Sequence, residues 1–123
     1  MLVSKQFTFD AAHYLTKYHG KCENLHGHTY RLQVTVNGEI KDDGMVVDFV
    51  ELKNLVKEKI ISKFDHQNLN DFFENPSAEL IAEYIWGELK SEIKGAQLHE
   101  ITLWETADSF VTCNDAHFSG TRN

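Results

Sequence analysis

The sequence has little cysteine, a single proline, no long apolar run and no excess of positive charge. Its two cysteines are too few for the disulfide framework of a small secreted domain, so a reducing compartment is expected. No segment approaches the roughly 20 consecutive apolar residues that would cross a bilayer. The start of the chain also lacks the continuous apolar block of a secretory signal. These features predict a cytoplasmic protein that does not span a membrane.

Basic side chains are in the minority. The formal net charge of -7 gives no general electrostatic attraction to nucleic acid or to an anionic membrane, because both need clustered lysine and arginine. A small anionic substrate is still compatible with this charge, since a few local groups are enough to bind it. With 123 residues, the chain is expected to form one domain over residues 1–123.

Alternating apolar and polar residues predict two strands in the first third of the chain. Apolar side chains fall on odd positions in residues 3–13 and on even positions in residues 28–36. Turn-forming residues over 37–44 then end the second strand. Each strand is therefore expected to bury one face.

From Asp48 the apolar period changes to steps of three and four residues. This period predicts an amphipathic helix over residues 49–64, with Asp48 as its N-cap. A second helix is expected over residues 78–93, capped by Asn75 or Ser77 beside the only proline.

Two short strands, over residues 101–104 and 110–115, are predicted to follow the helices. The order strand, strand, helix, helix, strand, strand indicates an α+β fold, with an antiparallel four-stranded sheet and two helices on one face. Four strands cannot close into a barrel. At least one edge of the sheet therefore needs to be covered or paired.

Three histidines fall where the strand patterns expect apolar side chains. His13 shares the inward face of the first strand with Phe7 and Phe9, and His26 and His28 continue the inward face of the second. Clustered buried imidazoles are costly without a shared partner, whereas one zinc ion binds a nitrogen of each. Three protein ligands leave one tetrahedral position open, which is typical of a catalytic zinc site.

Cys22 lies four positions before His26 and leaves two alternatives open. As a fourth ligand it would close the zinc site and make that site structural. As a thiolate in a polar segment with Lys17, His19 and Lys21, it would instead be stabilised and reach a substrate.

Two further features depart from the apolar pattern. Glu105 continues the inward parity of Ile101 and Leu103, so either the strand has reached an exposed end or the carboxylate binds paired N–H donors. Asp65 and His66 follow the first predicted helix. A carboxylate beside an imidazole is the arrangement that a general acid or base requires, although such neighbours are also common in loops by chance.

Five motifs resemble, in order and spacing, the pterin-synthase group of the tunnelling fold, which includes 6-pyruvoyltetrahydropterin synthase and 6-carboxytetrahydropterin synthase. They are F-x-A-A-H ending at His13, C-x-x-x-H-G-H from Cys22 to His28, V-D-F around Asp48, D-H-x-x-L-N from Asp65 to Asn70, and W-E-T around Glu105. The resemblance covers nearly the whole chain.

The resemblance implies a zinc-dependent lyase that acts on 7,8-dihydroneopterin triphosphate. His13, His26 and His28 would hold the zinc ion. Glu105 would anchor the pterin ring, because a carboxylate accepts from the two parallel N–H donors of the amino-pyrimidinone edge.

The resemblance also implies proton-transfer groups and an assembly. Cys22 would act as the proton-abstracting thiolate, with His66 as the complementary acid or base and Asp65 orienting it. Trimers of the family join three sheets into a barrel, and two trimers stack into a hexamer. Active sites would then lie between subunits, with Asp65 and His66 serving the Cys22 of a neighbour.

The spacing from Cys22 to His26 favours the 6-carboxytetrahydropterin synthases of queuosine and other 7-deazapurine biosynthesis, which release acetaldehyde and triphosphate. Three alternatives remain: a pyruvoyl synthase, a relative that uses Glu23 to make a hydroxymethyl pterin, and a non-catalytic zinc or pterin binding module. Candidates for the triphosphate contacts are Lys17, Lys21 and Arg122.

Overall fold

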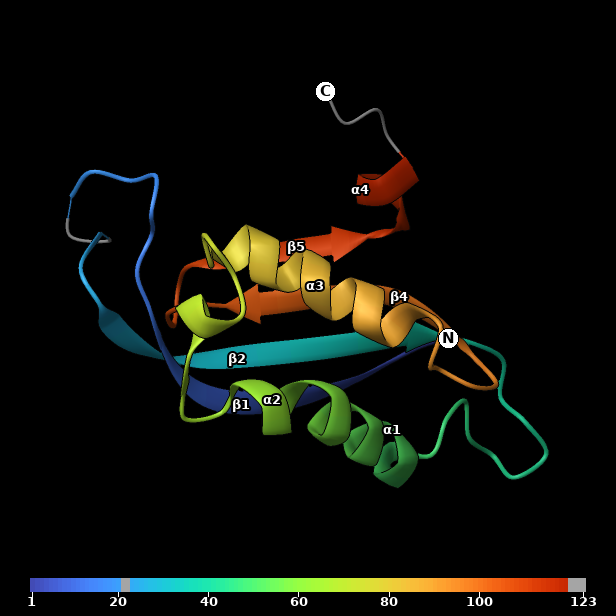
Figure 1. Cartoon of the computed structure of the whole chain (residues 1–123). Helices are drawn as coiled ribbons and strands as arrows, with labels where there is room; N and C mark the ends of the chain where they lie inside the picture. Colours follow the sequence, from blue (N-terminus) through green and yellow to red (C-terminus); the bar gives the residue numbers. More distant parts are fainter. Residues whose placement is uncertain (21–22, 120–123) are drawn as a thin grey trace.

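One β-sheet with helices on one face forms the body of the protein (Figure 1). The computed structural model describes residues 1–20 and 23–119. The elements, in chain order, are β1 (Leu2–His13), β2 (His26–Asn37), α1 (Phe49–Val56), η2 (Lys57–Ile61), α2 (Ser62–Phe64), β3 (Gln67–Asn68), η3 (Leu69–Asp71), α3 (Ala78–Lys90), β4 (Gln97–Trp104), β5 (Phe110–Asn114) and α4 (Asp115–Ser119).

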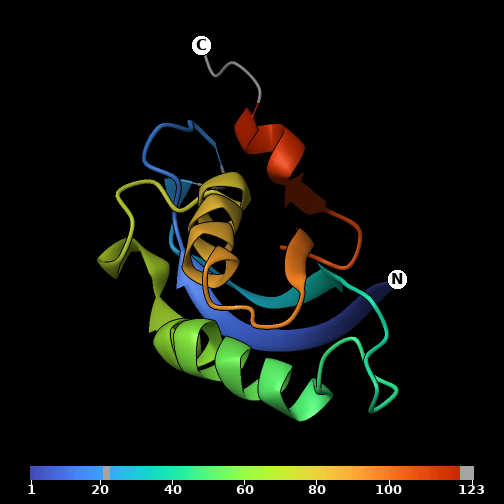
Figure 2. The same cartoon turned by 90° about the vertical axis from the view of Figure 1, so that its right-hand side faces the viewer.

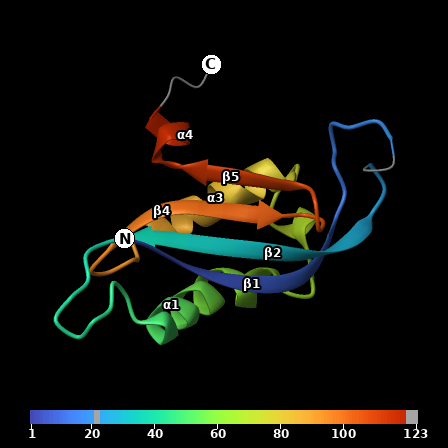
Figure 3. The same cartoon turned by 180° about the vertical axis from the view of Figure 1, so that it is seen from behind.

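The strands are arranged in the order β3-β1-β2-β4-β5. β1 and β2 pair antiparallel over their whole length, from Leu2 opposite Asn37 to His13 opposite His26. The pairs β2 with β4 and β4 with β5 are antiparallel as well. Seen from behind, these four long strands lie in front of the helices (Figure 3). The predicted α+β architecture, with helices on one face of an antiparallel sheet, is confirmed.

The sheet has a fifth strand that the sequence reading placed in a loop. β3 is only two residues long and pairs parallel with Ala11 and Ala12 of β1. Two backbone contacts hold it there: Asp65 Oδ1 accepts from the N–H of Asp10 at 2.9 Å, and the N–H of His66 donates to the carbonyl of Asp10 at 2.6 Å. The prediction of four strands was therefore one strand short, because a two-residue strand has no periodicity to detect.

The first predicted helix is present but is not a uniform α-helix. Asp48 caps α1 by accepting from the N–H of Val50 at 2.8 Å, as expected. η2 then widens the helix to a π-turn before α2 completes it at Phe64. Such π-turns are local irregularities inside an α-helix, and a hydrophobic period does not reveal them.

The second predicted helix corresponds to α3, which ends at Lys90, three residues earlier than expected. Of the two proposed caps, Ser77 is the one used, since its hydroxyl accepts from the N–H of Leu80 at 3.2 Å. In the view along the strands, α1 lies beside β1 while α3 lies above it (Figure 2). A short helix that was not predicted, α4, starts at Asp115, where the last strand was expected to end.

The hydrophobic core lies between the sheet and the helices. The strands contribute alternate residues, which confirms both predicted parities. Fully buried side chains of the core include Tyr30, Leu32, Val34 and Val36 from β2, Val56 from α1, Ile81, Ile85 and Leu89 from α3, and Ile101 and Leu103 from β4. No helix among the described residues is long and apolar enough to cross a membrane.

Candidate metal and substrate site

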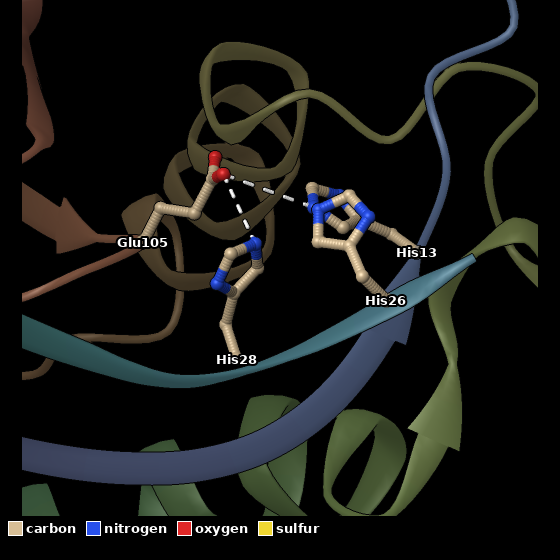
Figure 4. A group of neighbouring side chains, drawn as sticks. All are labelled: His13, His26, His28 and Glu105. Atoms are coloured by element: carbon tan, nitrogen blue, oxygen red, sulfur yellow. Dashed lines mark ion pairs between the residues drawn. The ribbon is translucent and has the colours of Figure 1, made fainter. Parts of the chain in front are cut away.

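The three inward histidines meet at the end of the β1–β2 pair. His13 and His26 are register partners, and His28 lies two residues further along β2, opposite Ala11. The ring centroids are 4.6 Å apart for His13 and His26, 5.1 Å for His13 and His28, and 4.8 Å for His26 and His28. Three imidazoles from two neighbouring strands therefore converge on one point (Figure 4).

Backbone carbonyls fix the orientation of two of these rings. His13 Nδ1 lies 2.7 Å from the carbonyl oxygen of Pro76, and His26 Nδ1 lies 2.7 Å from that of Asn24. A carbonyl oxygen only accepts, so both Nδ1 atoms carry the hydrogen and donate it. The lone pair of each neutral ring is then on Nε2, which is the state in which a histidine binds a metal.

The Nε2 atoms of two of these rings are buried without a hydrogen-bond partner in the described part of the chain. His13 is 1% exposed, and the Nε2 atoms of His13 and His28 have no hydrogen-bond partner among the described residues. Burial lowers the pKa of His28, the nearby His13 and His26 lower it further, and Glu105 opposes them. The neutral form is thus favoured. Unpartnered lone pairs of neutral imidazoles fit a metal ion, which would satisfy all three rings.

Glu105 completes the group from the opposite side. It follows the last residue of β4, and its N–H donates to the carbonyl of Ser109 at 2.9 Å. Its Oε1 lies 3.1 Å from His28 Nε2 and 3.8 Å from His13 Nε2. One ligand atom from each of the four residues lies within 4.8 Å of the other three. Figure 4 shows the carboxylate reaching over His28 toward the other rings.

The sequence left open whether Glu105 lies at an exposed strand end or points inward. The structure answers this question and also makes Glu105 a candidate metal ligand. The strand does end at Trp104, yet the side chain turns inward, and it is 27% exposed. The sequence pattern indicated only Cys22 as a candidate fourth ligand, whereas the structure places the Glu105 carboxylate beside the histidines. The signal was available, because Glu105 has the inward parity of β4, the strand that pairs with β2.

Asp65 and His66 form a second group on the other side of β1. His66 Nδ1 lies 3.1 Å from Asp65 Oδ2, as the pairing of a carboxylate with an imidazole requires. The bond from the N–H of Asp10 lowers the pKa of Asp65, and His66 lowers it further. The group includes the Asp10 side chain but none of the three histidines. Asp10 occupies an outward position of β1, opposite in parity to His13.

His66 has an unusual backbone. Its φ is +62°, in the left-handed region that residues other than glycine seldom adopt. Its side chain is 78% exposed and points its Nδ1 at Asp65, which leaves Nε2 facing outward. An exposed imidazole whose Nδ1 faces a carboxylate is chemically able to transfer a proton at its other ring nitrogen.

The remaining sequence-based candidates are Cys22, Lys21, Arg122, Lys17 and Glu23. Cys22, Lys21 and Arg122 lie outside the described residues. Lys17 is exposed, and Glu23 is half exposed with an oxygen 3.6 Å from His19 Nδ1.

Tyr30 is a residue of the site that the sequence reading assigned only to the core. It is fully buried, and its hydroxyl has no partner among the described residues. Its ring stacks on Phe9 with centroids 5.1 Å apart and lies edge-on to His13 and His28. Burial raises the pKa of Tyr30, and the charge of Glu105 raises it further, so the hydroxyl keeps its hydrogen.

Comparisons with known proteins identify one matching family and several similar proteins. Residues 2–116 match the family described as 6-pyruvoyl tetrahydropterin synthase. The chain is 40% identical to a 6-carboxy-5,6,7,8-tetrahydropterin synthase of Haemophilus influenzae, over 88% of this chain and 94% of the relative. It is 41% identical to a dihydroneopterin monophosphate aldolase of Pyrococcus furiosus, over 80% of this chain and 83% of the relative.

A solved structure of 6-pyruvoyl tetrahydropterin synthase from Caenorhabditis elegans superposes with a TM-score of 0.83 at 30% identity, covering 93% of this chain and 94% of that one. The tunnelling fold implied by the sequence motifs is confirmed.

Proposed function

Because the chain belongs to the 6-pyruvoyl tetrahydropterin synthase family, we propose that it is a 6-carboxy-5,6,7,8-tetrahydropterin synthase of queuosine biosynthesis. Its substrate would be 7,8-dihydroneopterin triphosphate, and its products 6-carboxytetrahydropterin, acetaldehyde and triphosphate. Relatives with this name are 36–40% identical over most of the chain. The observation that carries the proposal is the convergence of His13, His26 and His28 on one point.

We propose that these three histidines hold zinc. The ion fits the donor set, since carbonyl contacts fix the tautomers of His13 and His26, and the Nε2 atoms of His13 and His28 have no hydrogen-bond partner among the described residues. When bound, it supplies a Lewis acid beside the substrate's side-chain hydroxyls and stabilises the negative charge that develops there.

The protein's own residues bind the ring and move protons. Glu105 anchors the pterin by accepting from its two parallel N–H donors, with one carboxylate oxygen for each. Cys22 takes a proton from the substrate side chain as a thiolate. His66 accepts or returns a proton at Nε2, because its Nδ1 faces Asp65.

We propose that the enzyme is a hexamer made of two trimers. Asp65 and His66 lie across β1 from the metal ligands of their own chain, so they are suited to serve a neighbour's site. β5 is an edge strand, and β3 covers β1 only at Ala11 and Ala12. Strand edges of this kind are available for pairing between subunits. Sedimentation analysis tests the assembly, and a monomer at working concentrations would contradict it.

A second function is favoured by one relative. The Pyrococcus furiosus protein, at 41% identity, is named an aldolase of dihydroneopterin monophosphate. Glu23 lies beside Cys22 in the loop where a glutamate would assist formation of a hydroxymethyl pterin. A pyruvoyl synthase is also compatible with the family. In each case the protein is a pterin-metabolising enzyme, and a cytoplasmic location is proposed for all of them.

The product distinguishes these functions. The zinc-loaded protein is incubated with 7,8-dihydroneopterin triphosphate, the pterin product is identified by mass spectrometry, and acetaldehyde is assayed in the same sample. We expect 6-carboxytetrahydropterin and an equal amount of acetaldehyde. A pyruvoyl or hydroxymethyl pterin without acetaldehyde would assign one of the other activities. If the zinc-loaded protein does not convert 7,8-dihydroneopterin triphosphate at all, a non-catalytic binding module would be favoured.

A further inference from the structure

The candidate metal site contains four converging ligand atoms, one more than an open catalytic site requires. Tetrahedral zinc with bonds of 2.0–2.1 Å keeps its ligand atoms about 3.4 Å apart. Glu105 Oε1 lies 3.1 Å from His28 Nε2 and 3.8 Å from His13 Nε2, on either side of that separation. These two separations are close to those expected between a fourth ligand and two of the histidine nitrogens.

The proposed function needs the same carboxylate elsewhere. A carboxylate that accepts from two parallel N–H donors of a pterin uses both of its oxygens. It cannot at the same time bind a metal ion between the histidines in the geometry of this structure. The two roles of Glu105 thus exclude each other and belong to two states of the site.

The position of Glu105 in the fold permits both states. The residue lies just beyond β4, in the 105–109 turn, and its backbone is held there by the N–H donation to Ser109. Its side chain is partly exposed at 27%, in contrast to His13 at 1%. The carboxylate contacts the imidazoles of His13 and His28, and rotation about its side-chain bonds is enough to move it away from them.

We propose that Glu105 is a movable fourth ligand: it closes the metal site in the substrate-free enzyme, and the paired N–H donors of an arriving pterin draw it away. Removal of the carboxylate opens the coordination position that the substrate's hydroxyls then approach. This inference depends on the proposed pterin chemistry. It adds that substrate recognition by Glu105 and access to the metal are one event, so that an unrelated small molecule meets a closed site.

The inference predicts a negative coupling between two ligands. The probe is pterin without a side chain at C6, which offers the N–H donors but has no hydroxyls for the metal. If pterin competes with zinc for Glu105, bound pterin lowers the affinity for zinc, and bound zinc lowers the affinity for pterin by the same factor. In a Glu105→Gln variant the amide is a poor metal ligand and places a donor against a donor. The coupling then disappears.

The experiment measures zinc affinity by competition with a chelating dye, with and without saturating pterin. Three proteins are compared: the unmodified chain, Glu105→Gln, and Glu100→Gln as a control that removes the same charge from β4 on its other parity. We expect pterin to weaken zinc binding about tenfold in the unmodified chain and in Glu100→Gln. Glu105→Gln should bind zinc about tenfold more weakly from the start, with no effect of pterin, and a circular dichroism spectrum checks that it is folded.

The outcomes separate the inference from the function on which it depends. Two results would overturn the movable ligand and leave the proposed lyase activity intact. In the first, Glu105→Gln and the unmodified chain bind zinc with equal affinity. In the second, pterin does not weaken zinc binding although a direct titration shows that pterin is bound. An unmodified chain that binds neither zinc nor pterin would overturn the proposed function itself.

Discussion

His13, His26 and His28 are unusual because they occupy inward strand positions, where apolar side chains are expected, and yet carry polar imidazole rings. The strand parities predicted that all three point inward, and the register of β1 with β2 shows them together. An isolated buried histidine is commonly satisfied by hydrogen bonds within the core. Here the Nδ1 atoms of two rings are satisfied in that way, while the Nε2 atoms of His13 and His28 have no such partner among the described residues.

Replacement of Cys22 by alanine tests whether this residue is a zinc ligand or a proton-transfer group. We expect the Cys22→Ala variant to lose turnover, because the proton-abstracting thiolate is gone, and to keep one zinc ion per chain. Metal content by atomic emission and product formation are measured on the same sample. Loss of the zinc ion in this variant would mean that the thiolate is a ligand and that the site is structural.

Acidification should destabilise the metal-free chain through His28. Burial and the neighbouring histidines lower its pKa in the folded state below the ordinary value of 6.5. Between the lowered pKa and 6.5 the unfolded chain binds more protons, so the free energy of unfolding increases with pH in this window.

Chemical denaturation at a series of pH values measures this slope. The His28→Gln variant should show a smaller slope over the same window. An identical slope in both proteins would show that His28 is not the group responsible.

The segment between α2 and α3 contains a residue, His66, whose backbone conformation is unfavourable for its side chain. Asp65 and His66 are fixed to the backbone of Asp10, and His66 adopts a left-handed φ of +62° to meet it. Neither the two-residue β3 nor the π-turn η2 nor the short α4 was predicted, because each is decided by tertiary contacts and none shows a hydrophobic period. The long strands and helices were predicted well, since their alternation and capping signals agree with the tertiary structure.

Replacement of His66 by glycine should separate stability from activity. Glycine adopts the left-handed conformation without a steric penalty, so the free energy of unfolding should be unchanged or higher by up to about 1 kcal/mol. Turnover should decrease by a factor of about 10²–10⁴, the usual contribution of a general acid or base. Denaturant titration and steady-state kinetics measure the two effects, with His66→Ala as the matched comparison. A glycine variant of normal activity would exclude His66 from proton transfer.

The whole molecule combines a self-sufficient core with a site at one end of the sheet. Among the described residues, the hydrophobic core consists of apolar and aromatic side chains with Cys113, and the histidine cluster lies beside it at the end of β1 and the start of β2. We therefore expect the elements to hold together without a metal ion. This arrangement differs from a small zinc domain, in which binding of the ion is the main source of folding free energy.

Removal of the metal should therefore leave a folded, inactive protein. We expect treatment with a chelator to abolish turnover, to leave the circular dichroism spectrum unchanged, and to lower the melting temperature only modestly. Re-addition of zinc should restore activity. Unfolding upon chelation would contradict a catalytic role for the ion and favour a closed structural site.

At the level of the assembled site, the sequence could place individual side chains but not their separations. Parity directed Glu105 inward, yet its contact with His28 depends on a rotamer in a turn, for which no sequence pattern exists. The parity of β1 likewise did not reveal that Asp65 and His66 form a group separate from the three histidines. If the protein assembles as proposed, subunit packing decides which chain's histidines this pair faces, and no sequence pattern describes that packing.

X-ray absorption spectroscopy of the zinc-loaded, substrate-free protein tests the central claim most directly, because it reports the ligand atoms of the ion itself. We predict three nitrogen ligands at 2.0–2.1 Å with the signature of imidazole, one oxygen ligand and no sulfur. A sulfur shell near 2.3 Å, or fewer than three imidazoles, would contradict the account.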